Sequence, residues 1–124
     1  MSSQNEVFIK AIYRTIIEGN LASYKEMYEE RLDHTKLSNS EMDGYWKKQD
    51  EFYNRLNSEQ KEVLMLMMKQ TMIDTISHVF GIIDGSSGLV DAEVEPTLLL
   101  DSIDSEGDLQ DLFLAYIEDE NLFP

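Results

Sequence analysis

The chain has 124 residues, a formal charge of −15 and no cysteine. This length suits a single helical domain, residues 1–124, with one hydrophobic core, and 42% hydrophobic residues are typical of a globular chain. The lack of cysteine excludes disulfides and thiolate metal sites, and the acidity disfavours nucleic-acid binding.

The first residues, MSSQNEVFIKAIYR, do not have the basic and then apolar pattern of a signal peptide. The apolar runs are shorter than the roughly 20 residues that span a bilayer. We therefore expect a cytoplasmic protein without membrane attachment.

Two amphipathic helices are predicted at the start of the chain, over residues 4–18 and 21–33, because apolar residues recur there at intervals of three and four. Gly19-Asn20 is the predicted stop between them. Residues 34–39 are polar and predict a loop.

A third helix is predicted over residues 41–56, with Ser40 and Asp43 at the spacing of a capping box. Its aromatic stripe includes Trp46, Phe52 and Tyr53, and a stripe at this spacing is more often core than ligand site.

The central helix is predicted over residues 58–83, with Asn57 and Gln60 as its cap and Gly85 as its stop. Its residues are apolar nearly all round, and four of the seven methionines lie on it. Such a helix is expected to be buried on most sides.

The fold class that follows is mainly α, with four to five helices around this central buried helix. Residues 89–101 contain Pro96 and predict a short β-hairpin or one extended strand. The last helix is predicted over residues 108–120, with Ser105 and Asp108 at capping-box spacing.

Few residues suggest a catalytic or metal-binding site. Asp74 and His78 share a helix face, and Asp84 is the nearest third candidate ligand for a metal, but a local Asp–His hydrogen bond explains the pair more simply. Glu30 and His34 have the same spacing and the same explanation. The acidic stretch 101–111 fails the calcium-loop pattern, and neither a nucleophile elbow nor a phosphate loop occurs. We predict no enzyme, no cofactor and no metal.

The charge is distributed unevenly. All ten Lys and Arg residues lie between Lys10 and Lys69, whereas thirteen acidic residues follow Lys69. Such a surface either aids solubility or attracts a basic protein partner. The predicted contact residues are Asp101, Asp104, Glu106, Asp108, Asp111, Glu118, Asp119 and Glu120.

The block TMIDTI at residues 71–76, GIIDG at 81–85 and GDLQDLF at 107–113 is similar to small, acidic, uncharacterised bacterial proteins, some of which are immunity partners of toxins. The resemblance covers about the last 65 residues. It implies a bacterial, cytoplasmic and non-catalytic domain and transfers no site residues.

The leading hypothesis is a non-enzymatic binding module, an immunity or inhibitor protein that caps a basic partner such as a toxin. Two alternatives remain open. One is a small metal-dependent or acid/base enzyme centred on Asp74 and His78, and the other is a homodimeric structural or regulatory protein that uses its Met-rich surface.

Overall fold

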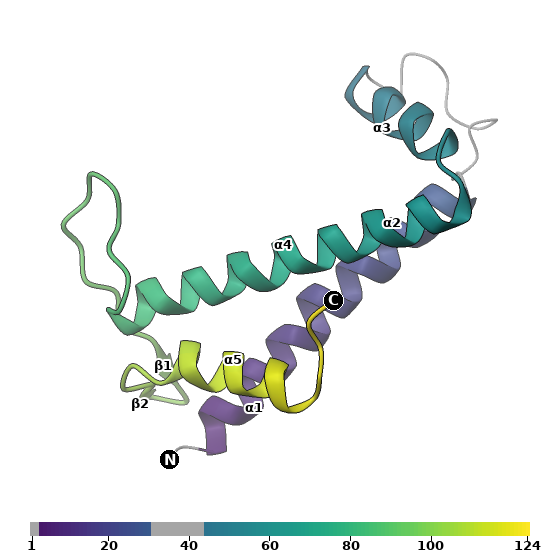
Figure 1. Ribbon diagram of the computed structural model, residues 1–124. Coiled ribbons are helices and arrows are strands. Elements are labelled where there is room, and N and C mark those ends of the chain that lie inside the picture. Colours follow the sequence, from purple (N-terminus) through teal and green to yellow (C-terminus); the bar gives the residue numbers. More distant parts are fainter. Residues whose placement is uncertain (1–2, 31–43) are drawn as a thin grey trace.

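The computed structural model describes residues 3–30 and 44–124, which are mainly helical with one two-stranded sheet, as predicted (Figure 1). The elements in chain order are α1 (Ser3–Ile12), the π-helix η1 (Tyr13–Glu18), α2 (Gly19–Glu30), α3 (Gly44–Asn54), α4 (Ser58–Asp84), β1 (Leu99–Leu100), β2 (Ile103–Asp104) and α5 (Leu109–Asp119). The predicted loop at 34–39, the Ser40–Asp43 cap and the Glu30–His34 pair lie outside the described residues.

The first three elements form one continuous helical rod, so the predicted stop at Gly19-Asn20 is wrong. Gly19 has helical torsion angles, φ −62° and ψ −48°, and its N–H donates to the carbonyl of Arg14 in the i→i−5 pattern. Glycine lowers helix propensity by only about 1 kcal/mol, and the packing of the residues around it outweighs that cost.

The π-helical turns explain how this rod presents one continuous apolar face. Ile9, Tyr13 and Ile17 are all buried, although residues four apart drift by about 40° per step on a 3.6-residue helix. The wider π turn holds more residues and offsets that drift. The rod therefore keeps these three side chains directed at the core.

Local sequence signals set both ends of α4. The side chain of Asn57 accepts a hydrogen bond from the Gln60 N–H at 2.8 Å, and the Gln60 side chain accepts one from the Asn57 N–H at 2.9 Å. This is the predicted capping box. Gly85 ends the helix with φ +85°, a left-handed conformation that glycine adopts without steric cost.

The predicted hairpin is confirmed, but it lies later than expected: β1 is at the end of the predicted range 89–101, and β2 follows it. Leu99 pairs with Asp104 and Leu100 with Ile103. The two turn residues, Asp101 and Ser102, both have positive φ, of 51° and 69°. A two-residue loop with two positive φ angles matches the right-handed twist of the paired strands.

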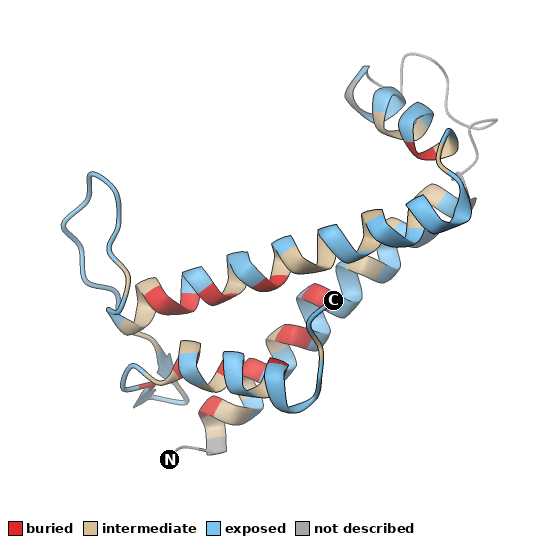
Figure 2. Cartoon of the chain, in the orientation of Figure 1, coloured by how far each residue is buried: buried red, intermediate tan, exposed pale blue. Residues whose placement is uncertain are grey.

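The core lies where α5 is wedged between α1 and α4 (Figures 1 and 2). Leu109, Phe113 and Ile117, spaced four apart on α5, are completely buried. Phe113 meets Phe80 of α4 edge-on, with ring centroids 5.4 Å apart. On the other side, the ring of Tyr116 meets that of Tyr13, in the π-helix η1 that continues α1, with centroids 5.7 Å apart. Helix α5 therefore joins the other two helices.

Helix α4 has the predicted extent but is less buried than its composition suggested. Its buried residues, Ile73, Ser77, Phe80 and Gly81, all lie in its C-terminal half. Met67, in the other half, is 62% exposed. The interpretation that apolar residues all round imply burial all round is wrong there, because α5 covers only the C-terminal half.

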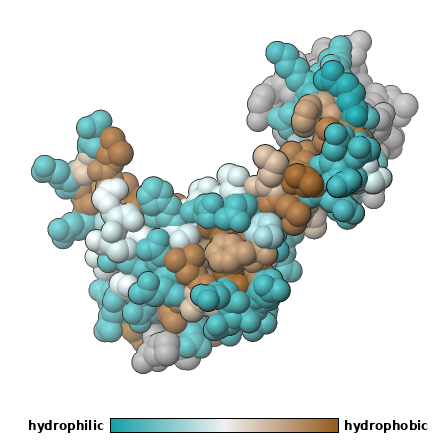
Figure 3. All heavy atoms as spheres, in the orientation of Figure 1, coloured by the Kyte–Doolittle hydropathy of each residue, from teal (hydrophilic) through white to brown (hydrophobic). Residues whose placement is uncertain are grey.

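The aromatic stripe of α3 is also less buried than expected. Tyr53 is buried, whereas Phe52 is 49% exposed and Trp46 is exposed as well. The space-filling view shows apolar surface where α3 meets α4 (Figure 3). Among the described residues, Tyr53 contacts α2 and α4, and these contacts cover it while Trp46 and Phe52 stay exposed.

The uneven burial on α4 can be tested with two substitutions on this one helix. We expect Ile73→Ala to lower the free energy of unfolding by about 2–5 kcal/mol, because it leaves a cavity in the core. Met67→Ala should change it by no more than about 0.5 kcal/mol. Urea unfolding of both variants measures this. Equal losses would contradict the described packing.

Candidate functional site

The eight acidic residues predicted to bind a partner lie on the hairpin and on α5. Asp101 and Asp104 belong to the hairpin, Glu106 and Asp108 to the turn that follows, and Asp111 to the first turn of α5. Glu118, Asp119 and Glu120 are at the other end of that helix. All are exposed except Asp108, which is half-buried. We call this hairpin and α5 surface the acidic end.

The eight carboxylates form two groups. Ten residues of helix separate Asp108 from Glu118, which corresponds to about 15 Å. Asp111 and Glu118 are seven apart and so share one face of α5, where the exposed Leu114 lies between them. The acidic end is therefore a strip along α5 with a carboxylate group at each end.

Few of these carboxylates have a structural role. The Asp101 carboxylate accepts a 3.3 Å hydrogen bond from the side chain of Gln4, and Asp104 accepts one of 2.7 Å from the Glu106 N–H. Within the part of the chain that the structure describes, none of the eight forms an ion pair. Their charges are thus directed at solvent.

Asp84 has a structural role that the sequence analysis missed. Its two carboxylate oxygens accept hydrogen bonds from the N–H groups of Leu109, at 3.2 Å, and Gln110, at 2.7 Å. These are among the donors that the first turn of a helix leaves unpaired. The predicted cap by Ser105 and Asp108 is not made, because the Asp108 side chain forms no capping bond. Asp84 therefore caps α5 from the end of α4.

The side chain of Gln110 extends this connection between the two helices. Its amide nitrogen donates to the carbonyl oxygen of Ser77 at 3.0 Å, and its amide oxygen accepts from the hydroxyl of Ser86 at 3.1 Å. No local signal could have revealed the arrangement, since Asp84 and Gln110 are 26 positions apart.

The other two residues of the proposed enzyme centre have different surroundings. Asp74 and His78 are both exposed, and the Asp74 carboxylate accepts a 2.9 Å hydrogen bond from Gln70. Among the described residues, Asp74 and His78 share no hydrogen bond, and no three His, Asp or Glu side chains are grouped as metal ligands. With Asp84 bound to α5, these three residues do not form one site.

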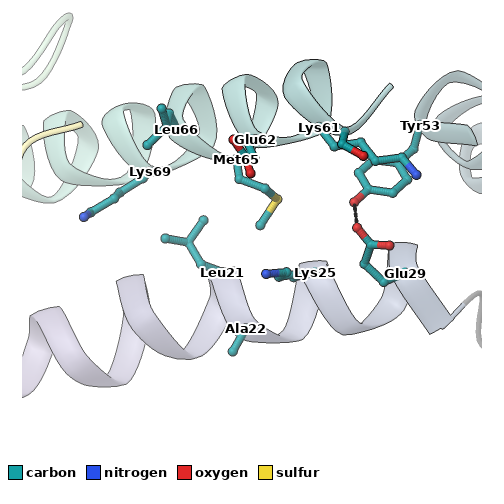
Figure 4. A pocket seen from close by; sticks show the side chains of 11 residues that line it. Leu21, Ala22, Lys25, Glu29, Tyr53, Lys61, Glu62, Met65, Leu66 and Lys69 are labelled. Atoms are coloured by element: carbon teal, nitrogen blue, oxygen red, sulfur yellow. Dashed lines mark hydrogen bonds between the residues drawn. The ribbon is translucent and has the colours of Figure 1, made fainter. Parts of the chain in front are cut away.

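A cleft between α2 and α4 is the second surface of interest (Figure 4). It has a volume of about 640 Å³, within the usual range for ligand sites. Tyr53 of α3 closes one end, and its hydroxyl donates to the Glu29 carboxylate. The Tyr53 ring stacks on Tyr28 at 4.8 Å, and the Lys61 ammonium lies 4.8 Å from its centroid. Tyr53 thus holds three helices together.

Comparisons of the chain with models of protein families, with curated proteins and with solved structures find no match. Among the described residues, no helix combines the length and apolarity needed to cross a membrane.

The capping role of Asp84 predicts the effect of its removal. We expect Asp84→Ala to lower the free energy of unfolding by about 1–2 kcal/mol, because two N–H groups of α5 lose their acceptor. Asp74→Ala, an exposed aspartate on the same helix, is the matched control and should change it by at most about 0.5 kcal/mol. Thermal or urea unfolding distinguishes them, and equal effects would contradict the capping role.

The environment of Tyr53 predicts a titration at high pH. Burial, followed by the hydrogen bond to Glu29, raises the pKa of Tyr53 to about 12 from 10.0. Because the folded state holds this proton more tightly, its stabilisation is complete below pH 10 and is lost as the pH rises towards about 12. Burial also raises the pKa of Tyr13, so phenolate absorbance should lose one tyrosine from the late titration in Tyr53→Phe and keep that of Tyr13. A late titration of unchanged amplitude in the variant would assign the step to another residue.

Proposed function

We propose that the chain is a non-enzymatic protein-binding module that caps a basic partner with its acidic end. Its closest functional class is an immunity or inhibitor protein, acting on a partner such as a toxin in the bacterial cytoplasm. The observation that carries the proposal is the set of exposed carboxylates without an ion pair among the described residues, on a chain with no Lys or Arg after Lys69.

Electrostatics support a binding role for these acids. Carboxylates concentrated on one surface accelerate encounter with a basic protein by about 10- to 1000-fold, and salt weakens the effect. Glu118 and Asp119 also lie in the last turn of α5, where the helix dipole disfavours negative charge by about 0.3–1 kcal/mol each. Acids placed against the dipole are better explained by binding than by stability.

The shape of the acidic end suggests what the partner presents. The two carboxylate groups, about 15 Å apart along α5, match a partner with two basic patches at that spacing. The exposed Leu114 between them supplies an apolar contact in the middle, as in interfaces with an apolar centre and a polar rim.

The homodimer alternative has one observation in its favour, the exposure of Met67 on the Met-rich half of α4. For the enzyme alternative, the described residues offer no grouped set of side chains comparable to the acidic end. The acidic end therefore supports the leading proposal best.

The proposal can be tested with two variants of equal charge. The first neutralises Asp111, Glu118, Asp119 and Glu120 as their amides, and the control neutralises four exposed acids elsewhere, Glu18, Glu26, Glu51 and Glu59, as Gln. We expect the native chain and the control to capture the same basic protein from bacterial lysate at low salt. The first variant should lose that protein, with association slowed about tenfold or more.

Both variants change the net charge by the same amount, so a difference in binding between them depends on where the carboxylates lie and not on the net charge. If both variants retain the partner, or both lose it, the acidic end is not the binding surface. Association rates of the purified pair, measured with increasing salt, provide the second readout.

A further inference from the structure

The cleft between α2 and α4 carries positive charge in an otherwise acidic protein. Lys25, Lys61 and Lys69 line it. Among the described residues, neither Lys25 nor Lys69 forms an ion pair. The carboxylates of Glu29 and Glu62 also line the cleft, so three positive and two negative side chains surround it, and that of Glu29 is held by the Tyr53 hydroxyl. The cleft therefore favours an acidic occupant.

The walls of the cleft are apolar between these charges. Leu21 of α2 and Met65 of α4 point toward one another across it (Figure 4). Leu66 of α4 also contributes to the lining. Methionine adapts to occupants of different shape. The matching occupant is an extended segment that combines small apolar side chains with carboxylates.

The chain itself contains such a segment in the loop that follows α4. Residues 89–95 read LVDAEVE, and no helix or strand is formed between Gly85 and Leu98. Val90 is 88% exposed and Val94 is 66% exposed, and the acids Asp91, Glu93 and Glu95 are exposed as well. The segment turns at Val90 and Asp91, where Asp91 has φ +56°. From Ala92 onward it alternates apolar and acidic residues, which in an extended chain face opposite sides.

The loop does not reach the cleft of its own copy. It begins at Gly85, and the sixteen residues of helix back to Lys69, the nearest residue of the lining, correspond to about 24 Å, with Met65 at about 30 Å. A fourteen-residue loop anchored at both ends extends at most about 23 Å, half of its contour length. Figure 1 shows the loop projecting from the end of α4, away from α3. The matching cleft is therefore that of another molecule.

We propose that the segment 89–95 of one copy binds in the cleft between α2 and α4 of a second copy. Val90 and Val94 contact the apolar walls, and Asp91, Glu93 and Glu95 pair with Lys25 and Lys69. The inference is independent of the proposed function, because it uses neither the hairpin nor α5.

The contact joins two different surfaces, so each pair leaves one free loop and one free cleft. Such heterologous association continues beyond the dimer unless the copies close into a ring. The native chain at physiological ionic strength should therefore gain mass progressively with concentration, measured by sedimentation or light scattering. At this ionic strength the repulsion between net-negative copies is largely screened.

A mixing experiment with two variants tests the contact directly. The double variant Lys25→Glu, Lys69→Glu reverses the charge of the cleft and leaves the loop intact. The double variant Val90→Ser, Val94→Ser removes the apolar side chains of the loop and leaves the cleft intact. Each variant alone should be monomeric, and a mixture of the two should form a one-to-one heterodimer that grows no further. Met67→Ser, an exposed apolar residue outside the cleft lining, is the control and should associate like the native chain.

Several results would overturn the proposal. These are a mixture that stays monomeric, a variant that associates alone as the native chain does, or loss of association in Met67→Ser. The last would place self-association on the Met-rich surface instead. All substituted side chains are exposed or half-buried, and circular dichroism checks that each variant is folded.

A labelled peptide provides a readout that does not depend on the loop variant. We expect the peptide SGLVDAEVEPT, residues 87–97, to bind the full native chain by fluorescence anisotropy. Binding should be at least tenfold weaker to the Lys25→Glu, Lys69→Glu variant and weaker at high salt. Absence of peptide binding would contradict the proposal, and so would a cleft that binds a fatty acid such as dodecanoate but not the peptide.

Discussion

The burial of α5 between α1 and α4 is the interaction on which the rest of the fold depends. Leu109, Phe113 and Ile117 fill the space between α4 and the N-terminal rod. The rod and α4 also touch directly, where the rings of Phe8 and Phe80 lie 6.1 Å apart. Full burial of one such side chain contributes about 1.5–3 kcal/mol, so three of them hold the two helices in place. The Asp84 cap and the Gln110 side chain fix the start of α5 in the same place.

This arrangement gives the molecule two ends with different properties. At one end the packed core supports a rigid strip of carboxylates on α5 and the hairpin. At the other, α2, α3 and the first half of α4 enclose a cleft lined with lysines, with Tyr53 as its main aromatic contact. The proposed basic partner binds at the first of these ends, and the proposed loop segment of a second copy binds at the other.

Much of the fold could be predicted from the sequence because its signals are local. Asn57, Gln60 and Gly85 set the ends of α4 through neighbouring backbone groups, and apolar spacing located α5. Burial could not be predicted in the same way, since Met67 and Ile73 look equally apolar, and only the packing of distant elements in the core decides that Ile73 is covered. Gly19 was misinterpreted because packing outweighed its low propensity. The role of Asp84 depends on α5, 25 residues further along the chain.

Native-state hydrogen exchange is the most direct test of the central claim that α5 joins the core. The account predicts that the amides of α5 around Phe113 and those of α4 from Ile73 to Phe80 exchange through one shared opening. The free energy of that opening should be the highest measured in the chain. Amides around Val63 to Met67 and in α3 should exchange earlier. Uniform protection along α4, or exchange in α5 ahead of the first half of α4, would contradict the account.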